Sequence, residues 1–196
     1  MIVKHLPFLI FILLHSMGCF TKDSAHSFQN VNDNTQPDKP RIELLKKAYE
    51  SHDYNTFFEL FPDSYNELIK FYGYNDSLGA KPLYQLYENH IDYFFQNDKA
   101  VRTDILAEKA YLITIDGTWE ADAVNLFQDN LYDMIINNPD IFVKILANKS
   151  EAESRKFWHF IFDGSTKHDL QIKEMFNSAY EKIKSIDERQ RSFFKN

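Results

Sequence analysis

The chain contains few of the residues on which several common protein classes depend. Cys19 is the only cysteine among its 196 residues, so no disulfide can form within the chain. Glycine occurs only five times, and neither a glycine-rich phosphate loop nor a G-x-S-x-G turn is present. The one extended apolar run, residues 6–14, is far shorter than the about 20 residues that a membrane-spanning helix requires. These absences argue against a disulfide-stapled scaffold, a nucleotide-binding loop and a permanent membrane span.

Positive charge is also in the minority. The chain carries 22 Lys and Arg against 29 Asp and Glu, a net charge of −7. A surface of this sign repels nucleic-acid phosphates and anionic lipid headgroups, so we expect no nucleic-acid partner. The same charge suits a basic partner protein, as when an acidic inhibitor covers a basic surface.

The N-terminal residues have the layout of a secretory signal peptide. Lys4 precedes the apolar run 6–14, and small residues lead to Gly18 and Cys19. This order resembles the signal peptides of bacterial lipoproteins, in which a small residue precedes the cysteine that becomes the new first residue. The resemblance implies that residues 1–18 are removed, that the Cys19 sulfur carries a diacylglyceryl thioether, and that the protein is exported and anchored in the cell envelope, at the outer membrane. The alternative is a conventional signal peptide that is cut elsewhere.

Two further segments follow the predicted anchor. Residues 19–39 are rich in Ser, Asn, Gln, Thr and Asp, with too few apolar side chains to offset the cost of ordering them, so they predict a flexible tether. A flexible chain of about 20 residues spans roughly 25 Å on average. Residues 40–196 have the length of one folded domain.

The domain shows apolar residues at a spacing close to 3.6. Leu83, Leu86, Tyr87, Ile91 and Phe94 form one such stripe, and similar stripes recur later in the chain. Glycines and prolines lie between the stripes, where helices end and begin. We therefore expect an all-α fold, a compact irregular bundle of about eight or nine helices. The expected helices cover residues 41–51, 54–61, 64–72, 82–96, 99–114, 119–137, 140–147, 151–163 and 170–187.

Local signals support several of these helix starts. Ser64 with Glu67, and Ser150 with Glu153, have the spacing of a capping box. Asn138 before Pro139 is a further N-cap candidate. Residues 111–115 are rich in strand-forming side chains, but a lone strand has no partner for its backbone, so we interpret them as the end of a helix.

Aromatic residues make up 16% of the chain, and most of them lie on the apolar stripes, which indicates a core of large rings. The segment 73–81 differs because its aromatic and amide side chains lie among glycines. Such a loop is a candidate surface for binding a small ligand or glycan, although a helix connection needs Gly, Asn and Asp in any case. The candidate ligand-binding residues are Tyr72, Tyr74, Asn75 and Asp76.

Catalytic patterns are weak. Glu88 with Asp92, and His159 with Asp163, stand four residues apart on expected helices, which places each pair on one face. Two carboxylates or a single His–Asp pair do not make a metal or acid–base centre, so no catalytic residue, metal or cofactor is assigned.

Three hypotheses for the function remain. The first is a lipid-anchored protein-interaction module of the envelope, including an immunity-type inhibitor of a basic partner. The second is a small-ligand or glycan-binding lipoprotein that uses the loop near Tyr74. The third is an envelope hydrolase that uses the paired acidic and histidine side chains. Cys19 is the residue for which the sequence assigns a specific chemical role.

Overall fold

The computed structural model describes residues 39–96, 100–164, 170–184 and 186–188. The predicted signal peptide, Cys19 and the predicted tether lie outside these residues, except for Lys39, which is the first residue of a helix. All described residues belong to one compact unit, residues 35–196.

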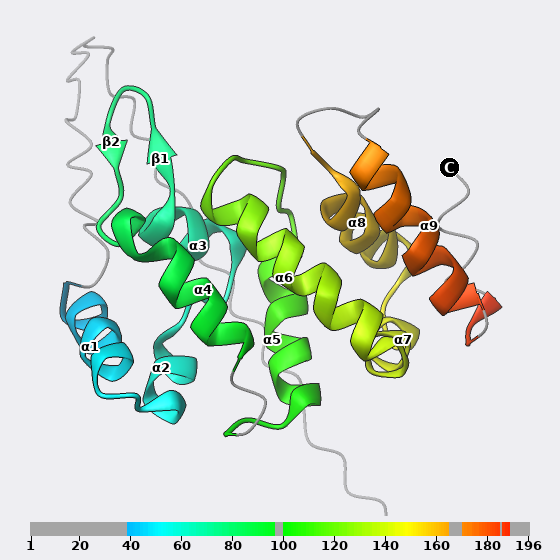
Figure 1. The fold of residues 1–196 in the computed structure, drawn as a ribbon, viewed down its shortest axis with the longest axis horizontal. Coiled ribbons are helices and arrows are strands. Elements are labelled where there is room, and N and C mark those ends of the chain that lie inside the picture. The colour runs from blue at the N-terminus through cyan, green and yellow to red at the C-terminus, as the bar shows by residue number, and fades with distance from the viewer. Residues whose placement is uncertain (1–38, 97–99, 165–169, 185, 189–196) are drawn as a thin grey trace, which may run out of the picture. The chain divides into compact units, whose positions relative to one another are not determined.

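The described residues form an all-α fold with a small hairpin, as Figure 1 shows. In this part of the chain there are nine α-helices, one short 3₁₀ helix and one two-stranded sheet. The elements are α1 (Lys39–Glu50), α2 (Tyr54–Leu60), α3 (Tyr65–Tyr72), β1 (Tyr74–Asn75), β2 (Gly79–Ala80), η1 (Tyr84–Leu86), α4 (Tyr87–Phe95), α5 (Thr103–Thr114), α6 (Ala123–Asn137), α7 (Pro139–Ala147), α8 (Glu151–Phe162) and α9 (Leu170–Lys184). The prediction of an all-α multi-helix bundle is confirmed.

Helix α6 lies at the centre of the packing. It contacts α3, α4, α7, α8 and α9, and it runs beside α4 for much of its length (Figure 1). Phe127, Leu131 and Ile135 recur every four residues along α6 and are fully buried, which is the stripe that such a central position requires. Helix α1, by contrast, packs chiefly against α2.

Large rings fill much of the core, as the sequence indicates. Phe57, Phe61, Phe94 and Phe127 have no exposed surface. Phe61 stacks on Phe94 with ring centroids 4.2 Å apart, and Phe94 lies 6.3 Å from Phe127. Aromatic side chains therefore join α2, α4 and α6 through one continuous set of contacts.

The capping predictions are confirmed in full at one helix start, in part at a second, and not at a third. Ser150 and Glu153 form a complete capping box at the start of α8. At α3 the Ser64 hydroxyl accepts from the Glu67 amide, but the Glu67 carboxylate accepts from the Asp63 amide instead of closing the box. Asn138 occupies the N-cap position of α7 without capping it, because its side-chain amide donates to the Met134 carbonyl at the end of α6.

The segment 73–81 is a hairpin rather than an irregular loop. Tyr74 pairs with Ala80, and Asn75 pairs with Gly79, in antiparallel register. The Asn75 side chain accepts from the amides of Ser77 and Leu78 at 3.0 and 2.9 Å, which closes the turn, and Gly79 supplies the positive φ of 78°. The sequence did not predict these strands because each is only two residues long.

None of the described helices combines the length and the apolar character that crossing a membrane requires.

Candidate functional site

A groove between α4, α6 and the connection 115–122 brings acidic and aromatic side chains together. It has a volume of about 500 Å³. We call it the acidic–aromatic groove, and its lining consists of Tyr87, Glu88, Asp92, Trp119, Ala121, Asp122, Asn125, Leu126 and Asp129. The helix spacing of Glu88 and Asp92 on α4 and of Asn125 and Asp129 on α6 directs both pairs to this groove.

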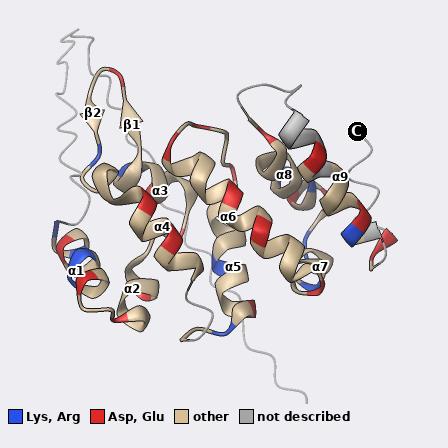
Figure 2. Ribbon diagram, in the orientation of Figure 1, with Lys and Arg blue, Asp and Glu red and all other residues tan. Residues whose placement is uncertain are grey.

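The charge of the groove has one sign. Four carboxylates line it and no Lys, Arg or His does. Among the described residues, none of these four carboxylates forms an ion pair. Figure 2 shows the acidic residues of α4 and α6 on the same face of the fold. Burial, followed by repulsion from the nearby Asp133, raises the pKa of Asp129, as expected where negative charge is crowded.

Hydrogen bonds hold the carboxylates in place. The Asp92 carboxylate accepts from the Asn130 side-chain amide at 3.1 Å. The Asp122 carboxylate accepts from the Tyr84 hydroxyl at 2.7 Å, and this bond raises the pKa of Tyr84 to about 12. The remaining lone pairs of both carboxylates are left for a ligand, since each oxygen accepts more than one hydrogen bond.

Trp119 is positioned by contacts on both sides. Its backbone amide donates to the Asp163 carboxylate at 3.0 Å, and its indole N–H donates to the Asn125 side chain at 3.3 Å. The Asn125 amide in turn donates to Asp129. Asp163 therefore supports the groove through Trp119, whereas His159, its predicted pair on α8, is exposed and has no such contact with the groove.

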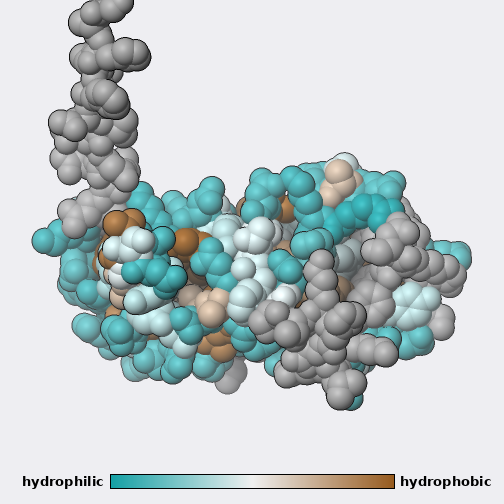
Figure 3. All heavy atoms as spheres, turned by 90° about the horizontal axis from the view of Figure 1, so that it is seen from above, coloured by the Kyte–Doolittle hydropathy of each residue, from teal (hydrophilic) through white to brown (hydrophobic). Residues whose placement is uncertain are grey.

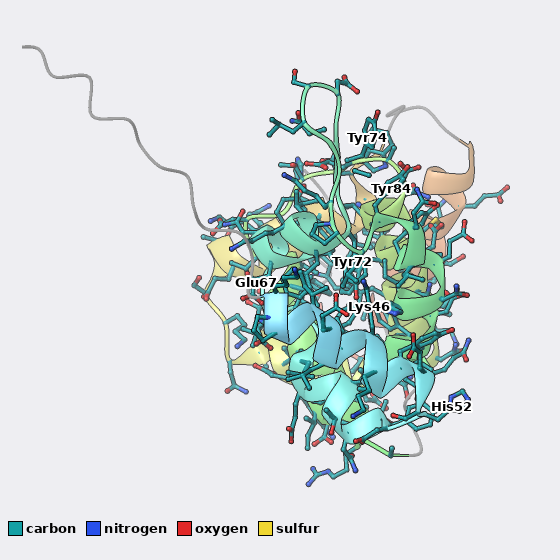
Figure 4. All side chains as sticks on the ribbon, turned by 90° about the vertical axis from the view of Figure 1, so that its left-hand side faces the viewer. Lys46, His52, Glu67, Tyr72, Tyr74 and Tyr84 are labelled. Carbon is teal, nitrogen blue, oxygen red and sulfur yellow. The ribbon has the colours of Figure 1, made fainter. Side chains whose placement is uncertain are left out.

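A row of tyrosines connects the groove with the hairpin. The ring of Tyr87 lies 5.7 Å from that of Tyr84, and the ring of Tyr84 lies 5.5 Å from that of Tyr74. Figure 4 shows Tyr74 and Tyr84 together at the base of the hairpin. The hairpin end of the fold is largely hydrophilic, with apolar residues in separate spots (Figure 3). We call Tyr74, Tyr84 and Tyr87 the tyrosine row.

The four residues predicted from the sequence as ligand contacts lie in two different environments. Tyr74 is 53% exposed, and Asn75 and Asp76 are exposed in the hairpin. Tyr72 is fully buried beneath them, where its hydroxyl lies 3.0 Å from the His90 Nδ1. Tyr72 therefore has no surface to offer a ligand, because the spacing of α3 places it on the inner face with Leu68.

The sequence did not identify Trp119, Asp122 and Asp129 as parts of a site. They are joined to Glu88 and Asp92 only by the packing of α6 on α4. The available signal was the excess of acidic residues, which gives the sign of the charge but not its location.

A larger groove of about 820 Å³ lies between α2, α5 and α7. Its floor includes the exposed Ile105 and Leu112. Three of its four carboxylates are paired with cations: Asp63 with Lys109, Asp104 with Arg102 and Glu108 with Lys149. The fourth, Glu59, shares the lining with Lys144. This groove is apolar without a preference for either sign of charge, in contrast to the acidic–aromatic groove.

No set of three or more His, Cys, Asp or Glu residues in the described part of the chain has a metal-binding arrangement. Comparison of the chain with models of protein families, with curated proteins and with solved structures found no match.

Proposed function

We propose that the protein is a lipid-anchored interaction module of the cell envelope that binds or inhibits a basic partner protein through the acidic–aromatic groove. The observation that carries the proposal is the combination of four carboxylates without cations and two aromatic side chains in one groove. A lysine or arginine side chain is the group that satisfies both features, because it pairs with carboxylates and lies favourably over the faces of Tyr and Trp. An immunity-type inhibitor would act by covering a basic surface in this way.

The lipid anchor at Cys19 is the second part of the proposal. It rests on the lipoprotein-like order that ends in Gly18 and Cys19. Two or more acyl chains make membrane attachment durable, whereas one chain gives only marginal binding. An anchored domain meets a membrane-associated partner at a raised effective concentration.

A charge-matched pair of variants tests the groove. The groove variant combines Glu88→Gln, Asp92→Asn, Asp122→Asn and Asp129→Asn. The control variant combines Glu50→Gln, Glu59→Gln, Asp140→Asn and Glu174→Gln, all exposed residues outside the groove. Both variants lose the same formal charge, so any difference in their affinity for a basic peptide arises from where the removed carboxylates lie.

The probes are oligolysine and oligoarginine peptides, titrated while the fluorescence of Trp119 is followed. We expect saturable binding to the wild type and the control variant, a loss of at least about tenfold in affinity for the groove variant, and weaker binding at higher salt. The same three proteins, expressed with their signal peptides, are then used to capture membrane proteins from the native envelope. Equal peptide affinities for the two variants would refute the groove as the binding surface.

A glycan-binding function is the second candidate, and the tyrosine row favours it. Tyr74, Tyr84 and Tyr87 follow one another at ring separations of 5.5 and 5.7 Å, and aromatic faces bind the CH-rich faces of sugars. Saturable quenching of Trp119 by oligosaccharides, abolished by Tyr74→Ala and unaffected by Asp92→Asn with Asp129→Asn, would support this function over the first. These two substitutions leave the hydrogen bonds of Tyr84 and Tyr87 in place.

A further inference from the structure

His90, on α4, is enclosed at the junction of four helices. It has no exposed surface, and its Nδ1 lies 3.0 Å from the hydroxyl of Tyr72 on α3. Its ring lies 4.7 Å from that of Tyr49 on α1 and 5.3 Å from that of Phe57 on α2. The two remaining sides of the ring are therefore covered by the helix pair α1 and α2.

The other ring nitrogen of His90 is unpaired. Nε2 is buried and has no hydrogen-bond partner among the described residues. A neutral imidazole loses one hydrogen bond in this setting, but a protonated one must bury a charge and an N–H donor that has no acceptor. The enclosure thus favours the neutral ring strongly over the charged ring.

The charged and titratable groups around His90 reinforce this preference. Lys46 and Tyr49 face it from α1, and Tyr72 faces it from α3, while α2 contributes the uncharged Phe57. Figure 4 shows the side of the fold on which Lys46 and α1 lie. Burial, followed by repulsion from Lys46, lowers the pKa of His90 to about 4.

Helix α1 packs chiefly against α2, and this helix pair has fewer helix partners than the central α6. Arg41 also pairs α1 with Glu67 of α3, so release of α1 breaks this ion pair. Elements with few partners open locally at a lower free energy than the central core. Opening of α1 and α2 would expose the His90 ring to water while α6 keeps its contacts with α3, α4, α7, α8 and α9.

We propose that His90 is the trigger of an acid-sensitive latch, in which protonation of its ring releases α1 and α2 from α4. This conformational device goes beyond the proposed function and does not depend on the acidic–aromatic groove.

The sign of the pH effect follows from linkage. In the open state an exposed histidine titrates near its ordinary pKa of about 6.5, whereas in the closed state it titrates near 4. Between these values only the open state binds the proton, so the closed state loses stability as the pH falls from about 6.5 to about 4. From pH 7.5 to pH 5 the opening equilibrium is expected to rise about 25-fold.

Hydrogen exchange read by mass spectrometry on the full-length protein tests the latch. Protection factors are measured at pH 7.5 and pH 5 and corrected for the intrinsic exchange rate. We expect the protection of residues 39–60 to fall by about 25-fold relative to that of α6. An equal change in both regions, or no change in either, would overturn the proposal.

Two variants assign the effect to one histidine. His90→Phe keeps an aromatic ring but cannot be protonated, so the pH dependence of residues 39–60 should disappear. His52→Gln removes the exposed histidine between α1 and α2 and should leave it intact. The opposite pattern would refute the proposal.

If His90→Phe does not fold, NMR titration of the histidine ring resonances in the wild-type protein tests the proposal instead. His90 signals of the closed state that change only below about pH 5, with α1 losing protection progressively from about pH 6.5 downward, support the latch. His90 signals that titrate near pH 6.5 while α1 stays protected would overturn it.

Discussion

At the scale of single residues, Gly117 determines how the connection 115–122 lies on the core. A Cβ atom at this position would lie 2.7 Å from the ring of Phe160 and 2.9 Å from the ring of Tyr65. The Tyr65 hydroxyl also donates to the carbonyl of Thr118, the next residue. The absence of a side chain at Gly117 therefore lets the connection approach the core and present Trp119 to the groove.

Gly117→Ala is expected to lower the free energy of unfolding by about 1–3 kcal/mol, because the methyl group overpacks against two rings. Chemical denaturation followed by circular dichroism measures this loss. In a Trp158→Phe background, the emission of Trp119 should also shift, since the displaced connection carries that residue.

Gly79→Ala is the matched control. A Cβ at Gly79 meets no atom within 4 Å, so its cost arises only from the positive φ of 78°. Its Trp119 emission should equal that of the parent. Identical Trp119 spectra for the two glycine variants would contradict the assigned role of Gly117.

Residue types alone predicted some local contacts and not others. The spacing of Ser150 and Glu153 was sufficient to predict the capping box at the start of α8, because a capping box uses only atoms within one helical turn. Tyr72 was predicted to contact a ligand because it lies next to Gly73 and Tyr74 in the sequence, but its side chain is buried. Its side chain belongs to the inner stripe of α3, and the direction of that stripe is set by the partner helices.

At the scale of elements, Arg41 joins α1 to the connection between α2 and α3. Its guanidinium donates to both oxygens of Glu67, at 2.9 and 3.1 Å, and to the carbonyls of Leu60 and Phe61. Burial raises the pKa of Glu67, but the hydrogen bonds from Arg41 and the Asp63 amide outweigh it and hold this pKa below its ordinary value. The Arg41 side chain therefore donates hydrogen bonds to carbonyls at the C-terminal end of α2 and holds α1 beside that end.

Arg41→Lys is expected to lower the free energy of unfolding by about 1–3 kcal/mol, because a lysine cannot reproduce the two-pronged contact with Glu67 and the two carbonyl bonds. Thermal and chemical denaturation measure the loss. Arg155→Lys provides the comparison, since Arg155 pairs with Glu151 on the exposed side of α8 and should change stability by less than about 0.5 kcal/mol. Equal effects of the two substitutions would show that Arg41 does not fasten α1.

The helices themselves were largely predictable from the sequence. The expected ranges 54–61, 140–147 and 151–163 differ from α2, α7 and α8 by one residue at an end. Residues 111–114 complete α5 despite their strand-forming side chains, because Tyr111 and Ile113 are buried against neighbouring helices. Tertiary burial outweighs the weak intrinsic preference of such residues.

At the scale of the whole molecule, we expect Cys19 to decide whether the domain is bound to a membrane. Lipidation of its sulfur would anchor the chain through at least two acyl chains, and the tether would separate the anchor from the domain. We expect the wild type to partition into the detergent-rich phase and Cys19→Ala to partition into the aqueous phase.

Ser16→Ala is the control for this experiment, since it keeps a small residue before the cleavage point and should retain the anchor. Mass spectrometry of the mature N-terminus identifies the modified residue. An unmodified N-terminus beyond residue 19 would contradict the lipoprotein assignment.

The sequence by itself determined the helical character of the chain and the sign of its charge. Both follow from local properties, the 3.6-residue spacing of apolar side chains and the count of ionisable groups. The tertiary structure alone decided which side chains meet. Trp119, Asp122 and Asp129 join Glu88 and Asp92 because α6 packs on α4, and His90 is enclosed because α1 and α2 fold over it. Such contacts depend on helix-to-helix packing between residues distant in sequence, which the spacing within any one helix does not encode.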